Sequence, residues 1–428
     1  MKGKITVIFG PNGSGKTRWA EQKRREMASD SVRYLAFSDA YGPATDRAYY
    51  LQLRWNQHDI DQETPTVGKL LGIDNESDTS RHQWLEQLIA LFGMSSLLDK
   101  YVILLSSGEL RKFQLIKTLL SRPKTLILDN PYIGLDAAAR DQLNELFPLL
   151  AEEEGIDLYL LLSRKGDIPA YAKDIRRCEG TKVRRFEDSV INTEGILVTP
   201  CPRNIVSSRN VIEMRHVSIR YGERTILRDL DWTVMKGERW ALCGPNGCGK
   251  STLLSLVCAD NPQSYACDIS LFGHQRGSGE SIWEIKRHIG YVSPEMHRSY
   301  LRAIPTLQVV ASGLKDTIGL YIRPTAAEKD VCHEWMRRFG IEQLAERNFM
   351  TLSSGEQRLA LVARAFVKNP DLLILDEPLH GLDDANRQLV LGLIEDYCKD
   401  TSKTLIMVTH YEEEIPHCIN KRLNLTKQ

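Results

Sequence analysis

Four short motifs occur twice in this chain, in the same order both times. A glycine-rich loop, Gly-Pro-Asn-Gly-x-Gly-Lys-[Thr/Ser], spans residues 10–17 and recurs at residues 244–251. Leu-Ser-Ser-Gly-Glu, Leu-Ile-Leu-Asp and Gly-Leu-Asp start at residues 105, 126 and 134, and again at 352, 373 and 381. Offsets of 21 and then 8 residues separate these three motifs in both copies. So long a period indicates a doubled domain, because solenoid repeats have periods of about 20–50 residues.

The length of the chain, 428 residues, suits two domains with separate cores, since one domain takes about 150 residues. Two prolines, Pro200 and Pro202, interrupt the apolar periodicity between the two copies. We therefore expect a first domain over residues 1–198, a short linker over 199–209 and a second domain over 210–428.

Each half alternates strand-like and helix-like segments. An apolar run precedes each glycine-rich loop, and helical patterns follow the loops at 19–27 and 252–258. Later helical patterns, at 109–120 and 356–367, lead through a proline into another apolar run. This alternation predicts an α/β fold with a mainly parallel sheet flanked by helices in each half. A helical subdomain is also expected in each half, over about residues 52–100 and 300–350.

A loop of the form Gly-x-x-x-x-Gly-Lys-[Ser/Thr] between a strand and a helix predicts a phosphate-binding site. Its glycines let backbone N–H groups face the phosphates, and the helix N-terminus adds positive potential. We expect Lys16 and Lys250 to contact the β- and γ-phosphates of ATP, and Thr17 and Ser251 to offer hydroxyls to Mg²⁺. A glycine-rich turn without a ligand is the alternative, and two matches count against it. The residues expected to bind ATP are Gly10, Pro11, Asn12, Gly13, Ser14, Gly15, Lys16, Thr17, Gly244, Pro245, Asn246, Gly247, Cys248, Gly249, Lys250, Ser251 and Thr252.

An aspartate ends the apolar Leu-Ile-Leu-Asp run in each copy. Asp129 and Asp376 would lie at the carboxyl edge of the sheet, where such folds bind their ligands. We expect both carboxylates to hold Mg²⁺ through water. The alternative is an aspartate that caps a loop.

Composition excludes some classes of function. Lys+Arg and Asp+Glu both number 56, so no net charge attracts the chain to nucleic acid or anionic lipid. The nine cysteines are scattered without metal-ligand spacing, which is typical of free thiols in a reducing cytoplasm. The run at 5–9 has the length of a strand and not of a signal peptide, and no run approaches the ~18 apolar residues of a membrane span.

The repeated motifs resemble the Walker A, signature, Walker B and D-loop motifs of ATP-binding-cassette (ABC) ATPases, over nearly the whole chain. The resemblance implies two ABC-type P-loop NTPase domains in tandem that pair head to tail. Each ATP would then lie between the Walker A loop of one cassette and the signature of the other. The signature residues that this implies as ATP contacts are Ser106, Ser107, Gly108, Ser353, Ser354 and Gly355.

A narrower resemblance is to the ModF-type tandem ABC proteins, which are associated with molybdate transport operons. It rests on four stretches of the second half, at residues 271–273, 276–280, 282–286 and 288–293.

The resemblance implies a complete catalytic set at the Walker A loop of the second cassette. Glu377 directly follows Asp376, where the family carries its water-polarising carboxylate. His410 resembles the switch histidine at the γ-phosphate, and together with Lys250 and Glu377 it makes up the expected catalytic residues. Tyr221 lies 23 positions before Gly244 and resembles the aromatic that stacks on adenine, with a core aromatic as the alternative.

The other site departs from the family pattern. Asn130 stands in place of the catalytic carboxylate, and Arg164 in place of the switch histidine. An amide does not accept a proton from water, and general-base help is worth roughly 10²–10⁴-fold in rate. Nine residues precede Gly10, which leaves no room for the family's N-terminal strands and adenine-stacking aromatic. We therefore expect one active and one degenerate composite site.

The family usually has a glutamine that links Mg²⁺ to the transmembrane partner. Here Ser293-Pro294-Glu295 occupies that place, and residues 36–39 occupy it in the first half. Glu295 is a candidate substitute. The missing glutamine weakens the expectation of an ordinary membrane transporter.

We expect an ATP-hydrolysing tandem ABC protein with ATP and Mg²⁺ as cofactors, of the kind that serves as the ATP-binding subunit of a transporter. Its partner would be a membrane permease, and its location cytoplasmic or peripheral on the inner face of the cytoplasmic membrane. A nucleotide-gated switch that acts on the ribosome is the alternative, although the short linker and zero net charge count against it. A DNA-maintenance ATPase would carry a coiled-coil insertion or a zinc motif, and the sequence has neither.

Overall fold

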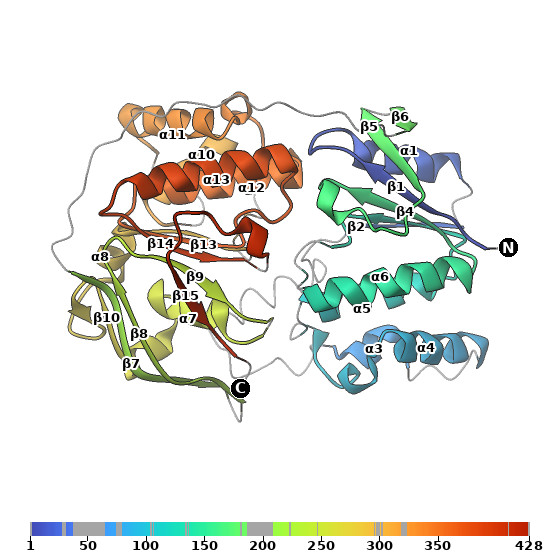
Figure 1. Ribbon diagram of the computed structural model, residues 1–428, viewed down its shortest axis with the longest axis horizontal. Coiled ribbons are helices and arrows are strands. Elements are labelled where there is room, and N and C mark those ends of the chain that lie inside the picture. The colour runs from blue at the N-terminus through green and yellow to red at the C-terminus, as the bar shows by residue number, and fades with distance from the viewer. Residues whose placement is uncertain are drawn as a thin grey trace. The chain divides into compact units, whose positions relative to one another are not determined.

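The computed structural model describes residues 2–27, 31–36, 65–73, 79–102, 105, 107–132, 135, 137–179, 182–185, 209–221, 224–245, 247–294, 296, 300, 303–317, 323–409 and 411–426. The chain divides into two compact units, Met1–Val190 and Ile191–Gln428 (Figure 1). The expected linker lies outside the described residues except for Arg209, so its limits stay a prediction.

The first unit is built on a six-stranded sheet in the order β2-β3-β4-β1-β5-β6. The first five strands in this order are parallel, and β6 runs antiparallel to β5. The strands are β1 (Ile5–Phe9), β2 (Val32–Ala36), β3 (Thr125–Asp129), β4 (Asp157–Leu162), β5 (Asp174–Glu179) and β6 (Lys182–Arg185).

Helices cover both faces of this sheet because its strands alternate between two apolar clusters. Ile8 and Ile127 pack with Ala20 of α1 on one face. Their neighbours Val7 and Leu126 pack on the other face with the remaining helices, among them a helical subdomain formed by α3 and α4. The helices are α1 (Lys16–Glu26), α3 (Val67–Leu71), α4 (Thr79–Leu91), η1 (Ser95–Leu97), α5 (Ser107–Leu119), α6 (Ala137–Glu152) and η3 (Lys165–Asp167).

The second unit repeats this architecture on a five-stranded parallel sheet in the order β12-β13-β14-β9-β15. Position by position, this order matches β2-β3-β4-β1-β5 of the first unit. The duplicated α/β fold with mainly parallel sheets is therefore confirmed. The strands are β9 (Arg239–Cys243), β12 (Ile289–Val292), β13 (Leu372–Asp376), β14 (Thr404–Val408) and β15 (Lys421–Asn424).

The second unit also contains a four-stranded antiparallel sheet in the order β11-β10-β7-β8. Apolar residues of this sheet, of α7 and of one face of the parallel sheet form a single core cluster. Helix α7 therefore lies between two sheets (Figure 1). The elements are β7 (Asn210–Tyr221), β8 (Arg224–Met235), α7 (Lys250–Val257), η4 (Pro262–Ala266), β10 (Asp268–Leu271), β11 (His274–Gln275) and α8 (Ile282–Arg287).

The other face of the second parallel sheet packs against the remaining helices of the unit, which share one large apolar cluster. Those that lie between β12 and α12 in the chain form the expected helical subdomain. The helices are α10 (Thr306–Ala311), η5 (Ser312–Leu314), α11 (Ala326–Arg338), η6 (Glu342–Leu344), η7 (Phe349–Thr351), α12 (Ser354–Phe366), α13 (Asp384–Lys399) and η8 (Glu412–Glu414).

Candidate active site

Each glycine-rich loop joins an interior strand of its parallel sheet to the helix that follows it, β1 to α1 and β9 to α7. Gly15 and Gly249 are the N-caps of these helices, with φ of 92° and 100°. Glycine adopts such left-handed angles without the Cβ penalty that other residues incur. Neither N-cap makes a side-chain hydrogen bond to its helix. The first-turn N–H groups thus lack a side-chain cap and suit an anion.

The loop lysines fold back onto their own loops. Lys16 Nζ donates to the carbonyl oxygens of Gly10 at 2.5 Å and Pro11 at 2.9 Å. Lys250 Nζ makes the equivalent contacts with Gly244 at 2.6 Å and with Pro245 at 3.0 Å. Both lysines are buried. Each ammonium group is therefore held at the mouth of the loop, where it can turn to a phosphate.

The fourth variable position of the loop differs between the cassettes. In the first loop it is Ser14, whose buried hydroxyl has no hydrogen-bond partner among the described residues. An unpaired buried hydroxyl is costly, and a phosphate oxygen would satisfy it. In the second loop it is Cys248, which is 2% exposed and packs into the core with α7.

In the first cassette, three donors surround the carboxylate of Asp129 at the end of β3. Thr17 Oγ1 and the hydroxyl of Tyr34 donate to Oδ2 at 3.1 and 2.8 Å. Asn130 Nδ2 donates to Oδ1 at 2.9 Å. Burial, and secondarily the charge of Asp129, raises the pKa of Tyr34 well above its ordinary value. The phenol therefore stays protonated and donates to the carboxylate. No sequence motif points to Tyr34, which is 95 positions from Asp129 in the chain.

Asn130 and Glu377 occupy the same backbone position in the two cassettes. Their φ angles are 51° and 49°, both in the left-handed region. Asn130 N–H donates to the carbonyl of Leu161 at 2.9 Å, and Glu377 N–H donates to that of Val408 at 3.0 Å. The backbone is therefore the same, and the side chain alone distinguishes an amide from a carboxylate.

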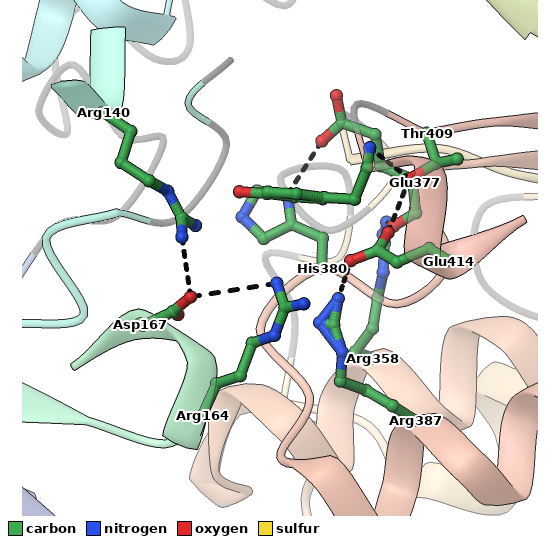
Figure 2. A network of polar contacts seen from close by, with 10 residues as sticks. Arg140, Arg164, Asp167, Arg358, Glu377, His380, Arg387, Thr409 and Glu414 are labelled. Carbon is green, nitrogen blue, oxygen red and sulfur yellow. Dashed lines mark hydrogen bonds and ion pairs between the residues drawn. The ribbon is translucent and has the colours of Figure 1, made fainter. Parts of the chain in front are cut away.

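The carboxylate of Glu377 is directed at the imidazole of His380 (Figure 2). Glu377 Oε2 and His380 Nδ1 are 3.1 Å apart, and both side chains are largely buried. Ile133 stands at the position of His380 in the first cassette. The sequence analysis did not identify His380, although its place between Glu377 and the Gly-Leu-Asp motif is a signal that could have found it.

A buried arginine links the signature helix of the second cassette to the end of β13. Arg358 on α12 donates to the carbonyls of Ser293 at 3.2 Å and Asp376 at 3.1 Å, and also to the carbonyl of Glu377. Arg111 holds the equivalent position on α5 and is fully buried. An arginine stands two residues after the signature glutamate in both cassettes, and this repeat in the sequence could have identified the pair.

Within each cassette, an arginine–carboxylate pair connects two segments. One is the loop that follows β4 or β14, and the other is the helix that follows the Gly-Leu-Asp motif, α6 or α13. In the first cassette, Arg140 Nη1 and Arg164 Nη1 lie 2.9 and 3.8 Å from Asp167 Oδ1. In the second, Arg387 pairs with Glu414, which also accepts a hydrogen bond from Thr409 Oγ1 at 2.5 Å. Figure 2 shows both sets. These pairs position the segments that carry the expected switch residues.

The structure places some of the other expected site residues, and the rest lie outside the described part of the chain. Tyr221 ends β7 half-buried, and its hydroxyl accepts a hydrogen bond from Asn261 Nδ2 at 3.0 Å. Ser353 caps α12 by accepting a hydrogen bond from the Glu356 N–H, Ser354 is exposed, and Gly355 is buried. Four expected residues and the side chain of Ser107 lie outside the described part of the chain; the four are Asn246, Glu295, His410 and Ser106. Their roles stay predictions.

Each cassette brings a hydroxyl residue of its loop and a strand-end aspartate as candidate ligands for Mg²⁺. In the second, Ser251 and Asp376 provide a hydroxyl and a carboxylate, the hard oxygen donors that Mg²⁺ prefers. In the first, Asp129 already accepts hydrogen bonds from three donors on its two oxygens.

Two glycine-rich loops, two buried Walker B aspartates and two signature helices that each bury an arginine define a tandem ATP-binding-cassette protein. The chain belongs to the ABC transporter family, whose model matches residues 1–133 and 227–380. Within the part of the chain that the structure describes, no helix combines the length and apolar character of a membrane span.

Relatives and solved structures agree with this assignment. The ABC transporter ATP-binding protein ModF of Escherichia coli K12 is 36% identical over 97% of this chain and 90% of its own length. An uncharacterized ABC transporter ATP-binding protein of Schizosaccharomyces pombe is 29% identical over 98% of this chain and 91% of its own. A chain from a model of ribosome-bound archaeal Pelota and ABCE1 shares the fold, with a TM-score of 0.64, 18% identity, and coverage of 99% and 72%. The resemblance to the ModF type is therefore confirmed.

Proposed function

We propose that this protein binds ATP at both glycine-rich loops and hydrolyses it at the loop of the second cassette. One observation carries the proposal: Asn130 and Glu377 share a backbone conformation, and Glu377 alone has a carboxylate. In the proposed reaction, Glu377 accepts the proton of the attacking water, as a general base. Asn130 has no proton-accepting group for this step.

Other residues of the second cassette bind and orient the nucleotide. Lys250 neutralises charge on the transferred phosphoryl group, and Ser251 and Asp376 would hold Mg²⁺. Bound Mg²⁺ supplies further neutralisation of the phosphate charge. Arg358 holds the carbonyls of Asp376 and Glu377, so the metal ligand and the base keep a set spacing. Tyr221 at adenine and His410 at the γ-phosphate are part of the proposal.

Signature serines and loop residues complete the nucleotide contacts that we propose. Ser353, Ser354 and Gly355, together with Ser106, Ser107 and Gly108, contact ATP as the family's signature motifs do. Lys16 holds nucleotide at the first loop, where turnover is slow.

Steady-state ATPase measurements test this assignment. Glu377→Gln should lower the rate by roughly 10²-fold or more, because it removes the general base. Asn130→Ala is the matched change in the first cassette and should alter the rate far less. An equal loss in the two variants would refute the assignment of turnover to the second cassette.

We further propose a membrane permease as the partner, and a cytoplasmic location that becomes peripheral to the membrane on binding. The support is the similarity to ModF, an ABC transporter ATP-binding protein, over nearly the whole chain, and the molybdate association that the ModF type implies. Copurification with the ATP-locked Glu377→Gln protein tests the partner. Recovery of a membrane protein supports the proposal, and recovery of ribosomes in its place contradicts it.

A further inference from the structure

The segment that connects η8 to β15 runs along helix α13, and two contacts fix its course. Near the start of the helix, Arg387 pairs with Glu414 (Figure 2). Near its end, Glu395 Oε1 accepts a hydrogen bond from the N–H of Cys418 at 3.2 Å. Four residues of extended chain reach ~14 Å, and the helix rises ~12 Å between Arg387 and Glu395, so the two lengths agree. Since Cys398 follows Glu395 by three positions on the same side of α13, Cys418 lies next to Cys398.

The thiols of these two cysteines are in contact. Cys398 is 5% exposed within the large apolar cluster of the second unit, and the half-buried Cys418 packs against the same cluster. The two side chains are joined by a hydrogen bond between their thiols, and both cysteines are free of disulfides. Thiols in direct contact can be joined by side-chain rotation, without the backbone movement that distant cysteines need.

Arg239, the first residue of β9, holds both sides of this pair. Its Nη2 donates to the carbonyl of Cys398 at 2.5 Å, and its own carbonyl accepts the N–H of Asn420 at 3.1 Å. The hydrogen bond from Cys418, and secondarily the charge of Arg239, lowers the pKa of Cys398 against the opposing effect of burial. The same hydrogen bond raises the pKa of Cys418. Cys398 therefore loses its proton first, and the thiolate is the reactive form of cysteine.

We propose that Cys398 and Cys418 are a redox modification site, which hydrogen peroxide converts into a disulfide between α13 and the segment that precedes β15. The Cys398 thiolate attacks one peroxide oxygen, so an S–O bond forms, the O–O bond breaks, and hydroxide leaves and takes up a proton. The sulfur of Cys418 then attacks Cys398 Sγ, so the S–S bond forms and the sulfenic oxygen leaves as water with the thiol proton. Two thiols are oxidised, and one peroxide is reduced to two water molecules. Peroxide is little larger than water and reaches the pair from the side of the half-buried Cys418.

Thiol mapping of the full-length protein tests the site. The protein is treated with hydrogen peroxide, its remaining thiols are blocked with iodoacetamide in denaturant, and its peptides are identified by mass spectrometry. A peptide pair joined through Cys398 and Cys418 should appear, and dithiothreitol should separate it. Cys418→Ser should abolish the pair. Cys267→Ser is the matched control, since Cys267 is also half-buried but donates to the carbonyl of Ser218 at 4.0 Å, and the pair should form as in the parent. Recovery of Cys398 and Cys418 on unlinked peptides, as thiols or as sulfinic acids, overturns the proposal.

A second readout tests whether the disulfide holds the segment where this structure places it. The bond closes a loop of about 20 residues, so oxidation should raise the melting temperature of the second unit by about 5–10 °C. Differential scanning calorimetry of the full chain measures the shift, and dithiothreitol should reverse it. Peroxide should cause no rise in the Cys418→Ser protein. A linked pair that forms while the melting temperature falls would show that the bond strains the fold, and would refute a disulfide site in this arrangement.

Discussion

Glu377 Oε2 lies 3.1 Å from His380 Nδ1, within the turn that follows β13. The contact is local in sequence but absent from the first cassette, where Ile133 replaces the histidine. The proposed general base therefore has a dedicated neighbour that holds its side chain. The cassette with the base is also the cassette with the residue that orients it.

The first prediction concerns this contact. His380→Ala should lower kcat about fivefold, because one hydrogen bond of ~1 kcal/mol no longer orients the base. The KM for ATP should stay within about twofold, since His380 contacts Glu377 and acts through it. Steady-state ATPase kinetics provide both constants. His333→Ala on α11, a half-exposed histidine paired with Glu342 at 3.7 Å, is the control. A loss as large as that of Glu377→Gln would assign His380 a role in the chemistry itself.

The second prediction concerns nucleotide stoichiometry. Glu377→Gln protein should bind about two ATP per chain, because both loops keep their lysine and their uncapped helix N-terminus. Lys16→Ala and Lys250→Ala, each added to that background, should reduce the number to about one. Equilibrium dialysis with radiolabelled ATP measures the number. Saturation at one ATP before either lysine is changed would show that the first loop holds no nucleotide.

The third prediction concerns Arg358. Its guanidinium group bonds three carbonyls from two segments and is 4% exposed. Arg358→Ala should lower the free energy of unfolding of the second unit by about 3 kcal/mol or more, because it leaves buried carbonyls without donors. Denaturant unfolding followed by tryptophan fluorescence measures the change. Arg337→Ala, at an exposed arginine on α11, is the control and should have little effect. Equal stability of the two variants contradicts the prediction.

The fourth prediction concerns the Arg387–Glu414 pair, whose side chains are 10% and 8% exposed. Arg387→Met and Glu414→Gln should each destabilise the protein by about 3–5 kcal/mol, because each removes one partner of a buried ion pair. The double variant should lose less than the sum. A double-mutant cycle measures the coupling. The pair Arg422–Glu412 near the same loop is exposed and should show no measurable coupling. Additive losses of stability would show that Arg387 and Glu414 do not stabilise each other, and would contradict this prediction.

Much of the fold and of the candidate site could be predicted from the chain alone, because the information is local. Each glycine-rich loop has glycines at left-handed angles, such as Gly15 and Gly249. Its lysine and hydroxyl follow at constant spacing, so the pattern itself identifies the loop. Apolar runs that end in Asp129 and Asp376 identified strands β3 and β13. The replacement of Glu377 by Asn130 is likewise visible in the sequence, because both residues directly follow an identified motif.

The tertiary structure alone showed the contacts between segments that lie far apart in the chain. Tyr34 meets Asp129 because β2 and β3 pair in one particular register, and no spacing rule connects residues 95 positions apart. Arg387 meets Glu414, and Arg358 meets the end of β13, through the packing of helices on the sheet. Motif spacing determines local backbone geometry, whereas strand register and helix packing result from burying apolar side chains of the whole domain at once. For that reason the motifs identified the two glycine-rich loops, and the folded sheet revealed that Tyr34 donates a hydrogen bond to Asp129.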